Sequence, residues 1–248
     1  MTREFRTGAE FRCHPSGPGR SPSPCVYPRG MDANVLSVNV ARPRQDPGGA
    51  DRVSGIDKRP ADRIELFAPG PSYGDGSGVV GDTIGDVDHH GGAQKAVYAV
   101  AREELDHWQA ELGRQVADGA FGENLTTRGV DWRTVVLNQQ VRVGTAVLEV
   151  SIPRSPCRTF AGWMGERGWL RRFTERGCCG SYFRVVQPGV VRPGDPLELG
   201  PAPDHGVTMQ VAFAGAMGDL DASRALVEAQ CLPAMYHQRH TEALARRA

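Results

Sequence analysis

Short segments of alternating apolar and polar residues, each ended by glycine or proline, restrict the fold of this chain most. Residues 34–40 alternate in this way, and residues 135–143 and 146–152 do so on either side of Gly144. The 248 residues include 31 glycines and 18 prolines, which favours many turns and short strands over a helical bundle. We therefore expect a mainly β protein whose body is a closed or partly closed barrel.

The remaining pattern predicts two further strands and a few helices. Strands are expected over 181–186 and 197–199, with a shorter extended piece within 53–60. Apolar residues every three or four positions predict a helix over 93–112, ended by Gly113, and a shorter helix over 163–173. Residues 68–81 are crowded with glycine and proline and predict a long loop.

Changes in composition divide the chain into three parts. Residues 1–30 are rich in proline and lack periodicity, which predicts a disordered extension, with Met31 as an alternative natural start. Residues 31–204 form the predicted β domain. Residues 205–248 contain two helical patterns, 221–230 and 235–247, and predict a small C-terminal helical appendage.

The composition argues against several classes of protein. Lys plus Arg and Asp plus Glu both number 29, so the net charge is zero and a broad nucleic-acid surface is not expected. The chain contains no apolar run of about 18 residues, so no membrane-spanning helix is predicted. No secretory signal is recognisable, and the six cysteines contain no CxxC pair, so we expect reduced thiols in the cytoplasm.

The segment 152–158 presents a thiol where chemistry is expected. A strand ends there, Pro153 and Pro156 stiffen its exit, and Cys157 follows Arg154 and precedes Arg158. Nearby cations favour the thiolate, which is a nucleophile and a soft metal ligand. The same pattern also fits a small thiol packed in the core.

Two other segments carry polar groups suited to a ligand. Residues 88–95 place His89, His90 and two glycines at the predicted start of the long helix, where free N–H groups and Lys95 would attract an anion. An ordinary helix cap with a solvated lysine is the alternative. Residues 119–127 include Asn124, which suits a heterocycle but is also a common turn residue.

Taken in order, these segments resemble the MOSC (molybdenum cofactor sulfurase C-terminal) domain family, and within it the YiiM-like bacterial proteins. The resemblance extends over about 35–199. It rests on residues 55–60, Gly81-Asp82, His90-Gly91-Gly92 with 95–98, 121–125, Pro153 to Cys157, 180–185 and Gly194-Asp195.

The resemblance implies a MOSC-type β-barrel-like fold that binds a molybdopterin-type molybdenum cofactor. Cys157 matches the family cysteine that ligates molybdenum and is the implied catalytic residue. The cofactor-binding positions expected by resemblance, or by charge beside it, are His90, Gly91, Lys95, Asn124, Arg154 and Arg158. A family-level association with pyridoxal phosphate is a minor further implication.

By the same resemblance, the chain would reduce small N-hydroxylated compounds, such as hydroxylaminopurine-type base analogues, in detoxification. The chain has neither a GxGxxG motif after a strand nor a four-cysteine cluster, so an electron-donor reductase is an expected partner. A homodimer is allowed; nucleic-acid and membrane partners are not expected. The alternatives are a carrier of cofactor or of persulfide sulfur on Cys157, and a binding module without turnover.

Overall fold

A computed structural model describes residues 32–247 of the chain. The predicted extension 1–30 and the alternative start at Met31 lie outside these residues. Among residues 32–247, no helix combines the length and the apolar character needed to cross a membrane. The domain boundary placed between residues 204 and 205 stays a prediction.

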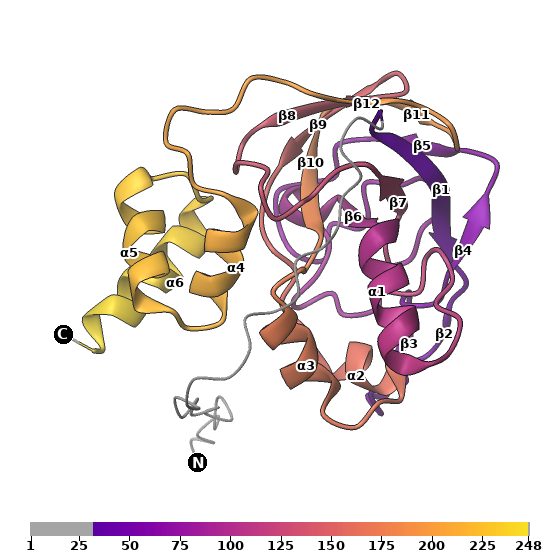
Figure 1. Ribbon diagram of the computed structural model, residues 1–248, viewed down its shortest axis with the longest axis horizontal. Helices are drawn as coiled ribbons and strands as arrows, with labels where there is room; N and C mark the ends of the chain where they lie inside the picture. Colours follow the sequence, from indigo (N-terminus) through magenta and orange to yellow (C-terminus); the bar gives the residue numbers. More distant parts are fainter. Residues whose placement is uncertain (1–31, 248) are drawn as a thin grey trace, which may run out of the picture.

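An eight-stranded sheet forms the body of the molecule (Figure 1). Its strand order is β12-β8-β9-β10-β6-β7-β1-β4, and only β6 and β7 pair in parallel. The strands are β1 (Asn34–Ala41), β4 (Lys58–Ala61), β6 (Val97–Ala101), β7 (Leu125–Arg128), β8 (Gln140–Val143), β9 (Ala146–Val150), β10 (Ser181–Gln187) and β12 (Leu197–Leu199).

The sheet curls back on itself. Asn34 at the start of β1 forms a β-bridge with Pro196, just before β12, and Leu197 N–H donates to the Ala33 carbonyl at 2.8 Å. Two small sheets complete the β structure, one of β5 (Ile64–Leu66) with β11 (Gly189–Val191), the other of β2 (Arg44–Gln45) with β3 (Val53–Ser54). The predicted mainly β, barrel-like fold is therefore confirmed.

The predicted helix over 93–112 is wrong in its first half. Residues Ala93–Lys95 form only a short 3-10 turn, Val97–Ala101 form strand β6, and the helix α1 is Arg102–Leu112. All five residues of β6 are buried, and the strand lies inside the sheet, between β10 and β7. A strand covered on both faces is apolar throughout, so its residues also fit a helical period.

Strand β1 is present as predicted, but its polar face is the more buried one. Ser37 and Asn39 are buried, whereas Leu36 and Val40 are partly exposed. The pairing of β1 with β7 shifts register between Val35 and Ser37. Such a bulge changes which side chains point inward. The inward polar pair meets β7, where Asn39 Nδ2 donates to Thr126 Oγ1 at 3.2 Å.

Two other predicted elements have different bounds. The strand expected over 135–143 begins only at Gln140, after a loop. The helix expected over 163–173 is two helices, α2 (Arg158–Met164) and α3 (Trp169–Arg176). Gly165 ends α2 and Gly168 precedes α3, and both adopt left-handed backbone angles that a continuous helix does not allow.

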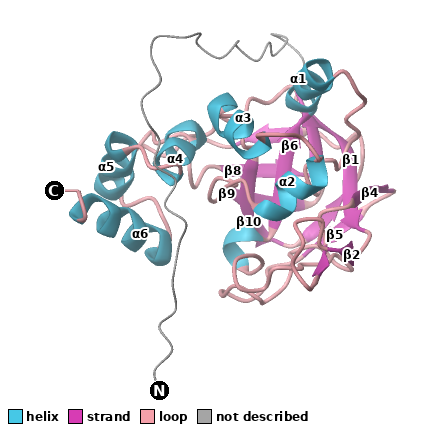
Figure 2. Ribbon diagram, turned by 90° about the horizontal axis from the view of Figure 1, so that it is seen from below, coloured by secondary structure: helices cyan, strands magenta, loops and turns pink. Residues whose placement is uncertain are grey.

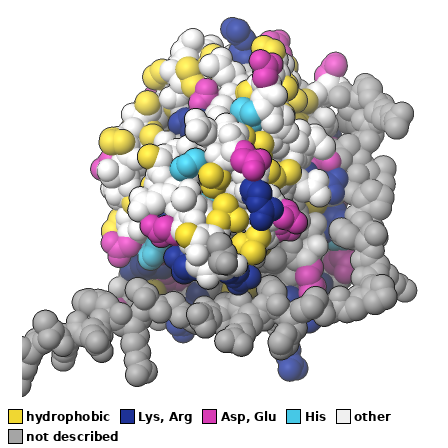
Figure 3. Space-filling view, turned by 90° about the vertical axis from the view of Figure 1, so that its left-hand side faces the viewer, with side chains coloured by type: hydrophobic (Ala, Val, Ile, Leu, Met, Phe, Trp, Pro, Cys, Tyr) yellow, Lys and Arg dark blue, Asp and Glu magenta, His cyan; other side chains and the backbone are white. Residues whose placement is uncertain are grey.

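Three C-terminal helices lie beside the barrel (Figure 2): α4 (Met209–Ala216), α5 (Leu220–Ala229) and α6 (Ala234–Ala245). The helical pattern of the sequence predicted α5 and α6 but did not extend to α4. Figure 3 looks onto this side, where charged, histidine and hydrophobic side chains are interspersed. Phe213 of α4 packs edge-on against Phe173 of α3, with ring centroids 6.2 Å apart, and both belong to one core cluster. The helices and the barrel therefore share a hydrophobic core.

Candidate functional site

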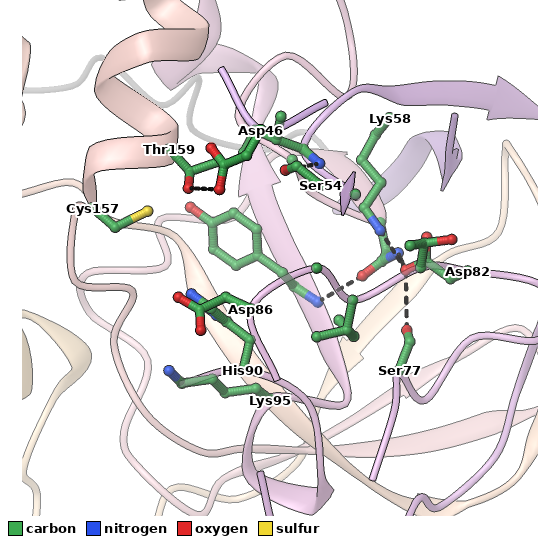
Figure 4. Close-up of a pocket in the computed structure, with 18 of the residues that line it drawn as sticks. Asp46, Ser54, Lys58, Ser77, Asp82, Asp86, His90, Lys95, Cys157 and Thr159 are labelled. Atoms are coloured by element: carbon green, nitrogen blue, oxygen red, sulfur yellow. Dashed lines mark hydrogen bonds and ion pairs between the residues drawn. The ribbon is translucent and has the colours of Figure 1, made fainter. Parts of the chain in front are cut away.

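One pocket opens where several loops meet the sheet, and strands from both halves of the chain reach it. Tyr98 comes from β6 and Tyr182 from β10, whereas Asn124 directly precedes β7. The connection from β9 to α2 supplies Arg154 and Cys157. The structure thus brings His90, Lys95, Asn124, Arg154 and Cys157, all predicted site residues, to one pocket (Figure 4).

Cys157 stands on one wall of this pocket, immediately before helix α2. Its thiol is free and half-buried, and its sulfur points into the pocket (Figure 4). Pro153 and Pro156 lie between β9 and this cysteine, so the chain leaves the sheet as the sequence predicted. A half-buried thiol among polar groups is available to a ligand, unlike a core thiol.

Arg154 is a buried cation that lacks a full set of partners. Arg154 is only 4% exposed. Its guanidinium carbon lies 3.8 Å from the ring centroid of Phe160 and 5.2 Å from that of Tyr98. Its Nη1 atom is buried and has no hydrogen-bond partner among the described residues. An unsatisfied buried donor costs free energy, so a pocket that retains one is suited to an acceptor from outside the chain.

His90 and Lys95 lie next to each other below Cys157 in the view of Figure 4, on the same side of the pocket. Burial, with the charges of Lys95 and Arg154, lowers the pKa of His90 to about 3. Burial, with the charges of Arg239 and Arg154, lowers the pKa of Lys95 to about 8. The imidazole is therefore neutral at pH 7, and the ammonium is held where an added negative charge would stabilise it.

Asn124 lines the pocket, but its amide is engaged by the protein. Its Nδ2 donates to Asp82 Oδ2 at 2.9 Å and to the Asn39 carbonyl at 3.3 Å, and its Oδ1 accepts from Tyr98 N–H at 3.2 Å. These bonds hold Asp82 and the start of β6. Asn124 therefore has a structural role, whether or not it also contacts a ligand.

Lys58 and Asp82 form the far side of the pocket, and no role was predicted for either of them. The Lys58 ammonium bonds Asp82 Oδ2, which also accepts from Ser77 Oγ at 3.0 Å. Burial raises the pKa of Asp82, but the charge of Lys58 and the hydrogen bonds from Lys58, Asn124 and Ala41 N–H together lower it below its usual value. Both residues fall within segments that carry the family resemblance, which is the signal that could have identified them.

Asp46, Arg52 and Thr159 tie the start of helix α2 to a distant loop. Asp46 accepts from Arg52 Nε at 2.8 Å, Thr159 Oγ1 at 2.9 Å and Gly48 N–H at 2.7 Å. These three bonds outweigh burial and lower the pKa of Asp46. The cluster positions the chain next to Cys157. It joins residues 113 positions apart, so no local pattern could predict it.

Two predicted cofactor-binding residues do not line the pocket. Arg158 is exposed, and its Nη2 lies near Gly49 on the outside of the loop. Gly91 packs against the protein's own backbone: a Cβ there would lie 2.9 Å from the Gly76 carbonyl oxygen. The predicted close approach at this glycine therefore serves chain packing.

The predicted anion site at a helix start near residue 93 is also wrong. Helix α1 begins at Arg102, and the N–H groups of Gly92 and Ala93 donate to the carbonyls of Gly76 and Gly70 at 2.9 and 2.8 Å. The loop 68–81 uses these donors. Lys95 still lines the pocket, so the attraction of an anion by this lysine stays a prediction.

The adjacent Cys178 and Cys179 are both buried. Burial raises the pKa of the Cys179 thiol to about 12, which keeps it protonated at neutral pH. Neither thiol lines the pocket. Of the cysteines that the structure describes, Cys157 alone reaches the site.

Comparison with known proteins places this pocket within a family. The model of the MOSC domain matches residues 86–198, which include His90, Lys95, Arg154 and Cys157. The uncharacterized protein YflK of Bacillus subtilis is 34% identical over 180 residues, covering 72% of this chain and 78% of YflK. Protein YiiM of Escherichia coli is 33% identical over 125 residues, covering 49% of this chain and 56% of YiiM.

A third relative and two solved structures extend the comparison. A Gibberella moniliformis protein named "Reductase" is 30% identical over 169 residues, covering 66% of this chain but 29% of its own length. The crystal structures of YiiM from Geobacillus stearothermophilus and from Escherichia coli superpose with TM-scores of 0.68 and 0.64. Each is 26% identical, covering 86% and 88% of this chain and 99% and 94% of theirs. The chain therefore belongs to the MOSC domain family, as a YiiM-like member.

Proposed function

We propose that this protein binds a molybdopterin-type molybdenum cofactor in the pocket and reduces N-hydroxylated compounds. One observation carries the proposal: a half-buried free thiol, Cys157, shares the pocket with a buried arginine, Arg154, whose Nη1 lacks a partner. Membership of the MOSC family and a reductase-named relative support the same assignment.

The residues of the pocket fit such a cofactor. A cysteine thiolate is a soft ligand suited to a transition metal. The unpartnered Nη1 of Arg154 fits an anionic or carbonyl acceptor, and Lys95 adds a second cation that no described carboxylate pairs. We assign metal binding to Cys157, and cofactor contacts to Arg154, Lys95 and His90.

When bound, the cofactor supplies a two-electron reduction in which an N–OH group, two electrons and two protons give N–H and water. The chain's own residues bind and orient the reactants. His90 is neutral, so its imidazole can donate or accept a hydrogen bond beside Cys157. The electrons come from a separate reductase, and we place the protein in the cytoplasm.

The proposal is tested by assaying reduction of an N-hydroxylated purine with a chemical electron donor. The full-length protein, expressed in a host that makes the cofactor, is compared with Cys157→Ser and with the matched control Cys178→Ser. We expect turnover in the wild type and the control, and none in Cys157→Ser. Full turnover in Cys157→Ser would show that the ligand is wrongly assigned.

The same samples separate the proposed enzyme from a carrier. A sulfur carrier would release cyanide-labile sulfur from the wild type but not from Cys157→Ser, and neither sample would turn over substrate. A binding module would retain the cofactor without turnover with any donor. Either pattern would replace the enzyme assignment.

A further inference from the structure

The C-terminal helix α6 reaches the pocket through a pair of tyrosines. The hydroxyl of Tyr236 on α6 is hydrogen-bonded to the hydroxyl of Tyr73 in the loop 68–81. Tyr73 in turn lies over the pocket residue Lys95, whose Nζ is 5.0 Å from its ring centroid. Helix α6 lies outside the span matched by the MOSC model, yet it contributes to the surroundings of the site.

Lys95 is held in place without a counter-ion. Its Nζ donates to the His89 carbonyl at 2.6 Å and lies 5.6 Å from the ring centroid of Tyr182. Within the described residues, no carboxylate forms an ion pair with it. Asp86 is the acidic group near it, but the Asp86 carboxylate is engaged by Arg52 at 3.0 Å and by His89 at 3.0 Å.

Arg239 of α6 adds a second unpaired cation beside Lys95. Lys95 lies over the Tyr73 ring and Arg239 over the Tyr236 ring, and the hydroxyls of these two tyrosines are hydrogen-bonded, so the tyrosine pair brings the two cations to one place. The charge of Arg239 also lowers the pKa of Lys95. The Arg239 guanidinium lies 5.2 Å from the ring centroid of Tyr236 and contacts the Met235 sulfur, and no carboxylate among the described residues pairs with it. Deeper in the pocket, the buried Arg154 keeps its unpartnered Nη1.

Cations that converge without carboxylates are stabilised when a multiply charged anion binds between them. A phosphate monoester matches two adjacent cations better than a carboxylate does, because it carries up to two charges on three oxygens. The tyrosine rings of Tyr73 and Tyr236 also offer apolar faces beside the charges. These features suit a planar molecule that carries a phosphate.

We propose that Arg239, together with Lys95 at the edge of the cofactor site, forms a subsite at the rim of the pocket for the phosphate monoester of a nucleotide-like substrate. The identity of the substrate rests on the proposed function, whereas the binding of a phosphate monoester at this subsite does not. The same phosphate group also occurs on a pterin cofactor. Arg239 is exposed and lies on the appendage, which favours the exchangeable substrate as the source.

The test measures binding of adenosine 5′-monophosphate and of adenosine to the full-length protein by calorimetry. The wild type is compared with Arg239→Gln and with Arg224→Gln, an exposed arginine of α5 that pairs with Asp221. We expect the monophosphate to bind about tenfold more tightly than adenosine, and Arg239→Gln to remove that difference. Arg224→Gln should bind like the wild type, and Arg239→Lys should recover part of the affinity.

Molybdenum and pterin contents of the same samples identify the source of the phosphate. Unchanged contents in Arg239→Gln, with loss of monophosphate binding, would support a substrate subsite. Loss of cofactor from Arg239→Gln would assign the cation to the cofactor phosphate and overturn the inference. Equal binding of monophosphate and adenosine, or binding of neither, would also overturn it. Arg239-dependent binding in a protein that never holds molybdenum would sustain the subsite and reject the proposed function.

Discussion

At the scale of residues, Arg154 is a buried cation whose Nη1 has no hydrogen-bond partner among the described residues, and we propose that it contacts the cofactor. Replacing it by methionine keeps much of its volume and its contact with Phe160 while removing the unpartnered buried donor. Removing a charge-assisted bond to an anion costs about 1.5–3 kcal/mol, so cofactor retention should fall by about tenfold or more.

Pterin content per chain and a thermal unfolding scan of the cofactor-free protein measure both effects of Arg154→Met. We expect the midpoint of unfolding to change little, because the lost contacts are offset by relief of the buried charge. Cofactor content equal to that of the wild type would remove Arg154 from the site.

His90 gives the site a pH dependence with a definite sign. Its pKa is lowered to about 3, so it stays neutral in the folded protein where the unfolded chain binds a proton. Protons bind preferentially to the unfolded state as pH falls from about 6.5 towards 3, so stability decreases over that range. Between pH 7 and 5, wild type should lose about 1–2 kcal/mol more than His90→Gln.

Urea unfolding of both proteins at pH 7 and pH 5 measures this difference. Identical losses in wild type and His90→Gln would show that His90 is accessible to protons in the folded state, contrary to the structure.

The site could be predicted from the sequence only where one short segment carries the chemistry. Arg154 follows Pro153 at the end of a strand and Cys157 follows Pro156, and the structure brings both of these residues to the pocket. Arg158, one residue later, was expected beside them, but the start of α2 turns it outward. The Asp46–Thr159 bond depends on the fold, so no local pattern contains it.

At the scale of elements, the contact between loop 68–81 and residues 90–93 positions Lys95. Gly92 has a φ of +71°, and a Cβ there would lie 2.0 Å from the Ser72 carbonyl oxygen. Gly92→Ala should therefore displace the loop that carries Tyr73. Gly113 is the matched control, since its φ is +61° and nothing lies within 4 Å of its Cβ position.

We expect Gly113→Ala to cost about 1–2 kcal/mol from backbone strain alone, and Gly92→Ala to cost clearly more. Urea unfolding measures both free energies. Equal costs would mean that the loop yields without penalty and does not fix this side of the pocket.

A strand could be predicted from the sequence where only one of its faces is buried. Where both faces are buried, the alternating pattern is lost and the strand could not be recognised. Strand 197–199 agrees with its predicted bounds, whereas β6 was assigned to a helix because every residue in it is buried. Strand β7 was missed because its core positions include Thr126 and Thr127, whose hydroxyls bond Glu123 and the Val100 carbonyl. Buried polar side chains with partners carry no apolar signal.

At the scale of the whole molecule, the C-terminal helices are part of one core with the barrel. Phe213 of α4 is 3% exposed and packs on Phe173, and Met209 N–H donates to the Val135 carbonyl at 2.9 Å. Phe213→Ala should destabilise the protein by about 3–5 kcal/mol, because it leaves a cavity in the shared core.

Calorimetry of Phe213→Ala tests whether this core is shared. We expect one unfolding transition at a lower temperature than in the wild type. Two transitions, with the higher at the wild-type temperature, would mean that the helices fold independently of the barrel.

Metal content tests most directly whether Cys157 and Arg154 hold a molybdenum cofactor. Wild type, Cys157→Ser and Cys178→Ser are expressed in a cofactor-producing host, and molybdenum and pterin are measured per chain by mass spectrometry. We predict near-stoichiometric molybdenum in wild type and Cys178→Ser, and its loss from Cys157→Ser. Absence of molybdenum and pterin from all three, even after reconstitution with cofactor, would contradict the claim.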